Sequence, residues 1–174
     1  MNRRDLYRFG TIALGGAVAF ALAVPGVAYL LDPLRKGSKK GDFQSLTKLR
    51  SLKPGEPRSF AVLDEHRDAW VRYPREPIGS VWLVRQALGA KPEVIAFTSE
   101  CPHLGCAVNL TAEGTSFLCP CHTSAFGLDG HQKNEIPPRG MDTLEVELSL
   151  GDDPDVLVKF QRFRTSEKEK TPLV

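Results

Sequence analysis

Cysteine and histidine residues gather in one short stretch of this 174-residue chain. All four cysteines, and two of the four histidines, lie within residues 101–122. They form two runs, which read C-P-H-L-G-C and C-P-C-H-T-S and are separated by 12 residues. Thiolates and imidazoles are ligands of zinc and of iron–sulfur clusters, and cysteines can also pair as disulfides. The stretch must therefore hold a metal, a disulfide, or both.

Each run has two cysteines and one histidine, and its first cysteine and its histidine stand at a spacing that suits metal binding. The first offers Cys101 and His103, and the second offers Cys119 and His122. Two cysteines and two histidines are the ligand set of a Rieske [2Fe–2S] centre, in which both histidines bind the same iron. Four such ligands could also hold a structural zinc ion. The residue types alone leave both kinds of centre open.

The order of residues in the two runs resembles the cluster-binding loops of the Rieske iron–sulfur proteins of cytochrome bc-type quinol oxidases. All six cysteines and histidines fall in register with that pattern, as do Gly105, Pro120 and Ser124. The resemblance implies that the inner iron is bound by Cys101 and Cys119, and the outer, solvent-facing iron by His103 and His122.

The resemblance also implies roles for residues around the ligands. Cys106 and Cys121 would form a disulfide between the loops, with Cα atoms about 4.4–6.8 Å apart. Such a bond would place the domain outside the reducing cytosol. Ser124 would donate its hydroxyl hydrogen to a bridging sulfide, and Leu104 matches the apolar residue beside the exposed histidines.

Three positions depart from the family pattern. Phe126 stands where high-potential members carry tyrosine, which suggests a lower-potential version that oxidises menaquinol. Thr123 stands where many members have glycine. The proline-rich third loop that shields the cluster is matched only in part, by residues 135–138, which read E-I-P-P.

The N-terminal part predicts a membrane anchor. No charged residue occurs from Phe9 to Leu31, and such a run would span about 34 Å as a helix, enough to cross a bilayer. Pro25 interrupts the run, which membrane helices tolerate. We expect an uncleaved signal-anchor, because a secretory signal usually has a shorter apolar core.

The arginine pair Arg3-Arg4, followed by Leu6, resembles a twin-arginine export signal. Positive charges flank the apolar run on both sides, so the positive-inside rule gives almost no orientation. A protein that receives its cluster in the cytoplasm must cross the membrane already folded, and the twin-arginine route carries folded cargo. We therefore expect a single-pass protein of the bacterial cytoplasmic membrane, with its N-terminus inside and its cluster domain on the periplasmic face.

The rest of the chain predicts a mainly β fold. Alternating or apolar runs indicate strands at 59–64, 80–85, 94–98, 143–148 and 156–163, with a turn at Asp129-Gly130. We expect a Rieske-type antiparallel β-sandwich with the two cluster loops at its tip. His66 and His131 are expected at the surface, and Trp70 and Trp82 in the core. The predicted parts are a cytoplasmic flank (1–8), a transmembrane helix (9–31), a flexible linker (32–42), the Rieske domain (43–163) and a mobile tail (164–174).

The predicted cluster chemistry suits quinol oxidation. With neutral histidines, two ferric ions, two sulfides and two thiolates carry no net charge, so an electron is added more easily than to an all-cysteine cluster. The metal also acidifies the outer N–H of each imidazole. His122, with His103 also exposed, would accept a proton from quinol while the centre accepts one electron.

The expected protein is the iron–sulfur subunit of a quinol–cytochrome c reductase, not catalytic alone. Its partners would be a cytochrome b subunit, a c-type cytochrome, menaquinol or ubiquinol, and the membrane. The small relay subunit of another exported oxidoreductase, similar to that of arsenite oxidase, is the alternative. A net charge of +2 and the lack of a basic stripe argue against nucleic acid as a partner.

Export is predicted to depend on the arginine pair. Changing Arg3 and Arg4 together to lysine keeps the charge but removes both guanidinium groups. The domain should then remain on the cytoplasmic side, where protease added outside cells cannot reach it. Normal translocation of this variant would refute the twin-arginine interpretation and leave the membrane anchor intact.

Overall fold

The computed structural model describes residues 2–35, 42–65, 67–68, 71–87 and 89–173. The chain divides into two compact units. One contains helix α1 (Arg3–Arg35) and a short hairpin of β3 (Arg67–Asp68) and β4 (Val71–Arg72), and the other contains the remaining strands.

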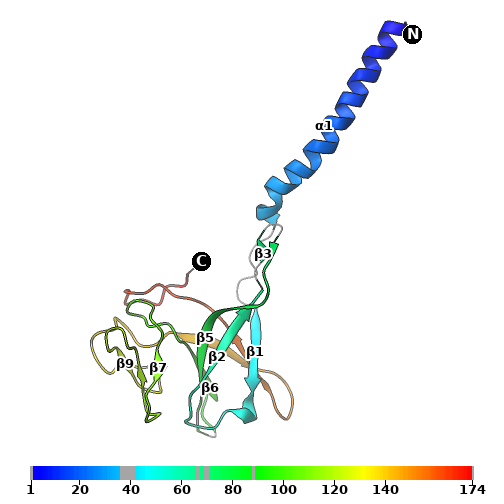
Figure 1. Cartoon of the computed structure of the whole chain (residues 1–174). Helices are drawn as coiled ribbons and strands as arrows, with labels where there is room; N and C mark the ends of the chain where they lie inside the picture. Colours follow the sequence, from blue (N-terminus) through cyan, green and yellow to red (C-terminus); the bar gives the residue numbers. More distant parts are fainter. Residues whose placement is uncertain (1, 36–41, 66, 69–70, 88, 174) are drawn as a thin grey trace. The chain divides into compact units, whose positions relative to one another are not determined.

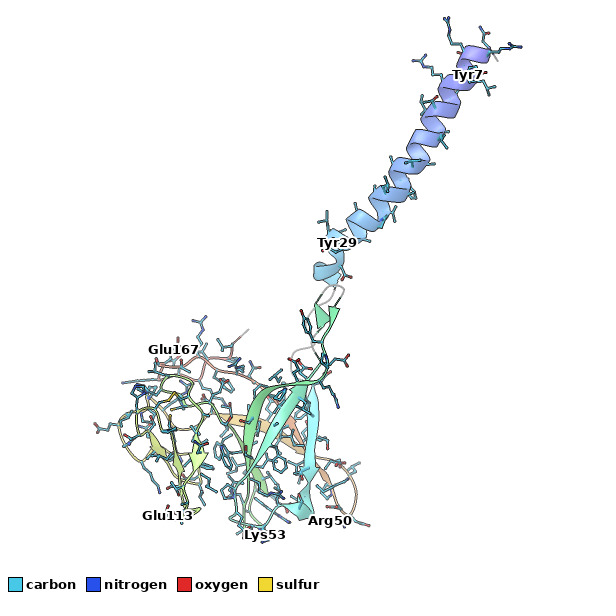
Figure 2. All side chains as sticks on the ribbon, in the orientation of Figure 1. Tyr7, Tyr29, Arg50, Lys53, Glu113 and Glu167 are labelled. Atoms are coloured by element: carbon cyan, nitrogen blue, oxygen red, sulfur yellow. A yellow bond between two sulfur atoms is a disulfide. The ribbon has the colours of Figure 1, made fainter. Side chains whose placement is uncertain are left out.

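Helix α1 has the length and composition of a membrane span. Its segment Arg3–Asp32 is long and apolar enough to cross a membrane. Tyr7 and Tyr29 lie near its two ends (Figure 2) and are 73% and 52% exposed. They are about 33 Å apart along the helix axis, and tyrosine is enriched at both membrane–water interfaces. The predicted apolar helix is confirmed.

The ends of α1 differ from the predicted bounds. The helix begins at Arg3 and ends at Arg35, so it extends beyond the predicted run of 9–31 in both directions. Residues 32–35 of the predicted linker are thus helical. The linker's remaining residues, apart from Asp42, lie outside the described residues, and its flexibility stays a prediction.

The larger sheet of the second unit is antiparallel, with the strand order β1-β11-β10-β6-β5-β2. Its strands are β1 (Phe43–Lys48), β2 (Arg58–Asp64), β5 (Glu76–Arg85), β6 (Val94–Thr98), β10 (Thr143–Leu148) and β11 (Asp155–Lys159). The outer strands β1 and β2 also contact each other, so the sheet nearly closes on itself (Figure 1). The predicted mainly antiparallel β class is confirmed.

Alternate residues of these strands fill the interior of the sheet. Val62, Val81, Leu83, Val156 and Val158 are each 0–1% exposed. Successive side chains of a strand point to opposite faces, so each strand supplies every second residue to one apolar core. Burial of these apolar side chains drives folding of the larger sheet.

A smaller sheet carries the cysteine- and histidine-rich loops. It consists of β7 (Asn109–Leu110), β8 (Phe117–Leu118) and β9 (Ala125–Phe126), in that order. Phe117 is fully buried beside Trp82, with ring centroids 5.3 Å apart. The indole N–H of Trp82 donates to the carbonyl of Val108 at 2.9 Å. Trp82 therefore packs, as predicted, against a second apolar core, which includes Phe97, Phe117 and Phe126.

The predicted strands are confirmed with some changes of length. The bounds of β6 and β10 agree with the prediction. Strand β5 begins earlier, at Glu76, because a register shift in β2 lets the pairing continue past Pro77. Strand β11 ends at Lys159, and Phe163 instead bridges Pro172 near the C-terminus. His131 is exposed, as predicted, whereas His66 and Trp70 lie outside the described residues.

The C-terminal tail, for which the sequence predicts mobility, is anchored at several points. The backbone N–H of Arg164 donates to the carbonyl of Thr171 at 2.8 Å. The Lys170 ammonium donates to the Thr143 carbonyl at 2.6 Å and lies 4.6 Å from the ring centroid of Phe163. Charge alternation in the sequence gave no sign of these contacts, which oppose free motion; the mobility itself stays a prediction.

Gly130 is predicted to be intolerant of a side chain. Its φ is +80°, and a Cβ there would lie 2.3 Å from a ring carbon of Phe97. At Gly114 φ is +69°, but a Cβ would meet no atom within 4 Å. Gly114→Ala should lower the free energy of unfolding by about 1–2 kcal/mol, the cost of a left-handed backbone. Gly130→Ala should lower the free energy of unfolding by the same amount and by about 1–3 kcal/mol more, because the new Cβ overpacks against Phe97.

Urea unfolding of the full chain in detergent, followed by circular dichroism, measures both losses. Equal losses for the two variants would show that Phe97 moves aside at no cost.

Candidate metal centre

The first loop, residues 101–106, closes into a tight turn. The backbone N–H of Cys101 donates to the carbonyl of Cys106, and that of Gly105 donates to the carbonyl of Cys101, both at 2.8 Å. Gly105 has φ +79°, a left-handed conformation that glycine adopts at little cost. This closure places His103 and Leu104 at the tip of the turn.

The second loop, residues 119–124, repeats this construction between β8 and β9. The N–H of Cys119 donates to the carbonyl of Ser124 at 2.8 Å. Its fifth residue, Thr123, also has a positive φ, +59°, a conformation that glycine adopts more easily than threonine. The amide nitrogen of Asn134 donates to the Thr123 carbonyl at 2.8 Å and helps to hold this backbone.

A disulfide joins the two loops, as predicted. Cys106 and Cys121 are bonded, and their Cα atoms lie 6.5 Å apart, within the predicted range. The sulfur of Cys119 lies within 4.8 Å of both. Because the disulfide removes Cys106 and Cys121 as ligands, Cys119 is the free thiol of this group.

The four predicted ligands come together as two pairs. The rings of His103 and His122 lie edge to face, with centroids 4.8 Å apart. Cys101 and Cys119 are free thiols, 0% and 1% exposed, and Cys119 lies close enough to Cys101 to affect the pKa of the Cys101 thiol. The thiols thus lie inside the domain, while His122 is exposed and His103 is half-buried.

Burial raises the pKa of the Cys101 thiol. The backbone N–H of His103 and the hydroxyl of Ser124 act in the opposite direction, and the neighbouring Cys119 raises the pKa further. Before any metal binds, Cys101 therefore holds its proton strongly. Thiolates are the metal-binding form, so binding at this site must release protons.

The hydroxyl of Ser124 is the clearest sign of an additional group at the site. Ser124 is fully buried, and its Oγ has no hydrogen-bond partner of ordinary geometry among the described residues. It lies close enough to the Cys101 sulfur to lower the pKa of that thiol. Buried hydroxyls are normally paired, so a hydrogen-bond acceptor between the loops would satisfy it.

A third segment supports the second loop from outside. The side-chain oxygen of Asn134 accepts from the N–H of Ala125 at 3.3 Å, and the N–H of Lys133 donates to the Ala125 carbonyl at 2.7 Å. Pro137, in the partly matched third loop, is buried, and Ile136 is 38% exposed. Sequence analysis did not single out Asn134, whose ability to bond backbone groups was its one local signal.

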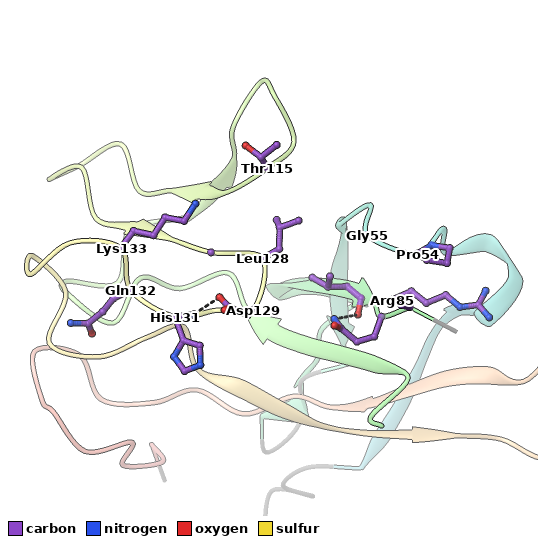
Figure 3. A pocket seen from close by; sticks show the side chains of 13 residues that line it. Pro54, Gly55, Arg85, Thr115, Leu128, Asp129, His131, Gln132 and Lys133 are labelled. Carbon is purple, nitrogen blue, oxygen red and sulfur yellow. Dashed lines mark hydrogen bonds between the residues drawn. The ribbon is translucent and has the colours of Figure 1, made fainter. Parts of the chain in front are cut away.

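A separate hollow of about 650 Å³ lies away from the ligands (Figure 3). Arg85, Asp129, His131 and Lys133 are among the residues that line it, and no cysteine is. Two of its charged groups already have partners. Arg85 pairs with Glu93 at 2.8 Å, and the Asp129 carboxylate accepts from the backbone N–H of His131 at 3.0 Å. This hollow is therefore distinct from the paired thiols and imidazoles.

Comparison with known proteins gives one consistent result. The model of the Rieske [2Fe-2S] domain matches residues 42–145. The menaquinol:cytochrome c reductase iron-sulfur subunit of Bacillus subtilis (strain 168) is 30% identical over 155 residues, which cover 87% of this chain and 89% of that protein. The cytochrome b6-f complex iron-sulfur subunit of Gloeobacter violaceus is 29% identical over 163 residues, covering 86% of this chain and 79% of that protein.

Among solved structures, the cyanobacterial plasma membrane Rieske protein PetC3 from Synechocystis PCC 6803 is 30% identical. The match covers 47% of this chain and 79% of that chain, with a TM-score of 0.37.

Two disulfide-linked loops with paired thiols and imidazoles, together with the match to the Rieske domain, define an iron–sulfur electron carrier. The chain belongs to the Rieske [2Fe–2S] family, and its similarity to subunits of cytochrome bc-type complexes supports the same type of subunit here. Membership implies one Rieske-type cluster. The residues present fit it: two buried thiols, two imidazoles nearer the surface, and the buried Ser124 hydroxyl, which has no partner of ordinary geometry in the described part of the chain.

Replacing Ser124 with alanine should lower the midpoint potential. A donor near the cluster stabilises the reduced form more than the oxidised form, because reduction adds negative charge. A hydrogen bond to a charged group contributes about 1.5–3 kcal/mol. A difference of about 1 kcal/mol between the redox states corresponds to about 40 mV for one electron, at 59 mV per tenfold. Redox titration of the purified protein measures the shift, and an unchanged potential would remove this role of Ser124.

Replacing Phe126 with tyrosine should shift the potential in the opposite direction. Phe126 is fully buried and packs in the same core as Cys101. A phenol hydroxyl donating to that thiolate would raise the potential by some tens of millivolts, on the same reasoning. The same titration tests the prediction. No change would mean that the ring at this position does not direct its edge at Cys101.

Proposed function

We propose that this chain is the iron–sulfur subunit of a membrane quinol–cytochrome c reductase. It receives one electron from quinol bound in a partner cytochrome b and passes it to a c-type haem. The observation that carries the proposal is a pair of buried thiols and a pair of imidazoles nearer the surface, on two loops that a disulfide joins. In this role the chain is not catalytic alone, because the quinol pocket and the haem would belong to its partner subunits.

The ligands of the cluster are Cys101, His103, Cys119 and His122. A [2Fe–2S] centre takes two protein ligands at each of two irons, and a pair of imidazoles and a pair of thiols supply them. A structural zinc ion would instead need four ligand atoms around one point. The unpaired Ser124 hydroxyl also suits a cluster, because a bridging sulfide gives it an acceptor.

When bound, the cluster supplies a one-electron acceptor and makes the outer N–H of its histidine ligands more acidic. His122 is the residue of this chain that accepts the proton. Once its acidified outer nitrogen has lost its proton, the exposed ring, now an imidazolate, would accept a hydrogen bond and then the proton from the quinol hydroxyl. His103 is half-buried, and its ring centroid lies 4.8 Å from that of His122. Its ring therefore restricts the orientations that the His122 ring can adopt.

Exposed apolar side chains in the first and third loops suit docking to an apolar partner. Leu104 is 56% exposed at the tip of the first loop, and Ile136 is 38% exposed in the third loop. Contact of these side chains with cytochrome b would exclude water from the proton transfer. Leu104 therefore serves docking while the histidine next to it binds metal.

The membrane arrangement follows from the same role. Helix α1 anchors the chain in the bacterial cytoplasmic membrane, with the N-terminus inside and the cluster domain on the outer face. The disulfide supports this orientation, because disulfides persist outside the reducing cytosol. Twin-arginine export would deliver the domain there with its cluster in place.

Menaquinol is the quinol that we favour. The relatives from Bacillus subtilis and Geobacillus thermodenitrificans carry the name menaquinol:cytochrome c reductase iron-sulfur subunit. Phe126 agrees, because the missing hydroxyl lowers the potential of the cluster, and menaquinol is the stronger reductant. These similarities to reductase subunits also favour a quinol partner over the protein-bound redox partner of an arsenite-oxidase-like relay.

A quinol-site inhibitor tests the proposal. Added to membranes that contain the whole complex, it should bind in cytochrome b, hydrogen-bond to His122 and shift the EPR g-values of the reduced cluster. The same inhibitor added to the purified chain should give no shift. Inhibition of quinol oxidation in the membranes without any change of g-values would contradict contact between His122 and the quinol site.

A further inference from the structure

The C-terminal segment 164–173, here called the strap, lies against the first cluster loop (Figure 1). It comes after the last strand of the main sheet, and it takes part in neither cluster loop. No metal-competent cysteine or histidine occurs in it. The segment instead reaches the first loop through hydrogen bonds to the loop backbone.

One residue of the strap makes two hydrogen bonds to that backbone. The N–H of Ser166 donates to the carbonyl of Pro102 at 2.9 Å, and its hydroxyl donates to the carbonyl of His103 at 2.7 Å. These carbonyls precede and follow the Cα atom of His103. Ser166 thus fixes the main chain on both sides of the proposed ligand.

The backbone of Ser166 is in an unusual conformation. Its φ is +62°, in the left-handed region that residues other than glycine seldom adopt. That conformation directs the backbone N–H and the hydroxyl of one residue at consecutive carbonyls. The adjacent residue Thr165 lies beside the loop, because its methyl carbon would be 3.7 Å from a Cβ built on Gly105.

A buried ion pair holds the strap in place. The Arg139 guanidinium donates to both carboxylate oxygens of Asp142, at 2.8 and 2.7 Å, and the two side chains are 10% and 5% exposed. The remaining donors of Arg139 reach the carbonyls of Arg164 and Glu167, which lie on either side of Ser166. The strap is therefore clamped at both ends of the short stretch that contacts the loop.

We propose that Ser166 is a positioning residue for the ligand His103. The strap holds the first loop in the shape that directs the His103 imidazole toward the cluster and against His122. This inference rests on the proposed function, because it assumes that His103 binds iron. It adds a second support to the loops: the disulfide ties them to each other, and the strap ties the first loop to the domain.

The test compares three variants of the full chain. Ser166→Ala removes the hydroxyl and keeps the backbone N–H. Ser166→Thr keeps the hydroxyl, and Thr123 shows that threonine adopts a φ near +60° in this fold. Lys168→Ala, at an exposed position of the same strap, is the matched control. The readouts are the EPR g-values of the reduced cluster and the rate at which an iron chelator removes the cluster.

Ser166→Ala should shift the g-values and speed cluster loss about tenfold, the lower end of effects seen when a group behind a metal ligand is removed. Ser166→Thr and Lys168→Ala should match the wild type. Identical behaviour of Ser166→Ala and wild type would overturn the inference. So would equal shifts in the alanine and threonine variants, because the hydroxyl would then not be the responsible group. A wild type without a Rieske-type signal would contradict the proposed function itself, and the inference with it.

Discussion

The bond between Cys106 and Cys121 is the constraint on which the metal centre depends. Each loop closes by itself through a hydrogen bond between its first and sixth residues, but those bonds do not set one loop against the other. The disulfide does so, with a Cα separation of 6.5 Å. It also leaves one free cysteine in each loop, so the same bond that fixes the geometry decides which thiols can bind metal.

The four predicted ligands differ in burial, which gives the thiols and the histidines different roles. Cys101 and Cys119 lie in the second core among aromatic side chains, where burial raises the pKa of the Cys101 thiol and a metal is needed to stabilise the thiolate. The histidines lie nearer the solvent, where a partner can reach their outer N–H groups. An electron carrier that also accepts a proton needs this asymmetry: a buried side that holds the cluster and an exposed side that meets the substrate.

Local sequence patterns predicted the parts of the fold that local physics controls. Strands β6 and β10 alternate or are continuously apolar, so their bounds agree with the prediction. The two-residue strands β7, β8 and β9 carry no such pattern, because closure of the loops creates them. The early start of β5 depends on pairing with β2 across a register shift, which no window of one strand reveals.

The metal centre was predictable because its chemistry restricts residue types at fixed spacings. The disulfide was predicted and is confirmed, and the four predicted ligands lie as two pairs, whereas their binding to iron stays a prediction. Supporting contacts were not predictable in the same way. Asn134 and Ser166 act through carbonyl groups of distant segments, and a serine or asparagine in a polar stretch has no signature of that role. The sequence of the strap predicts a mobile charged tail, because the residues that anchor it, such as Arg139, lie elsewhere in the chain.

Pulsed EPR of the purified, reduced chain tests the central claim most directly. If His103 and His122 bind one iron while Cys101 and Cys119 bind the other, the spectrum must show coupling to two directly bound imidazole nitrogens. Analysis of the same sample must give two irons and two acid-labile sulfides per chain. Zinc without labile sulfide, or an iron–sulfur signal that lacks nitrogen coupling, would contradict the account.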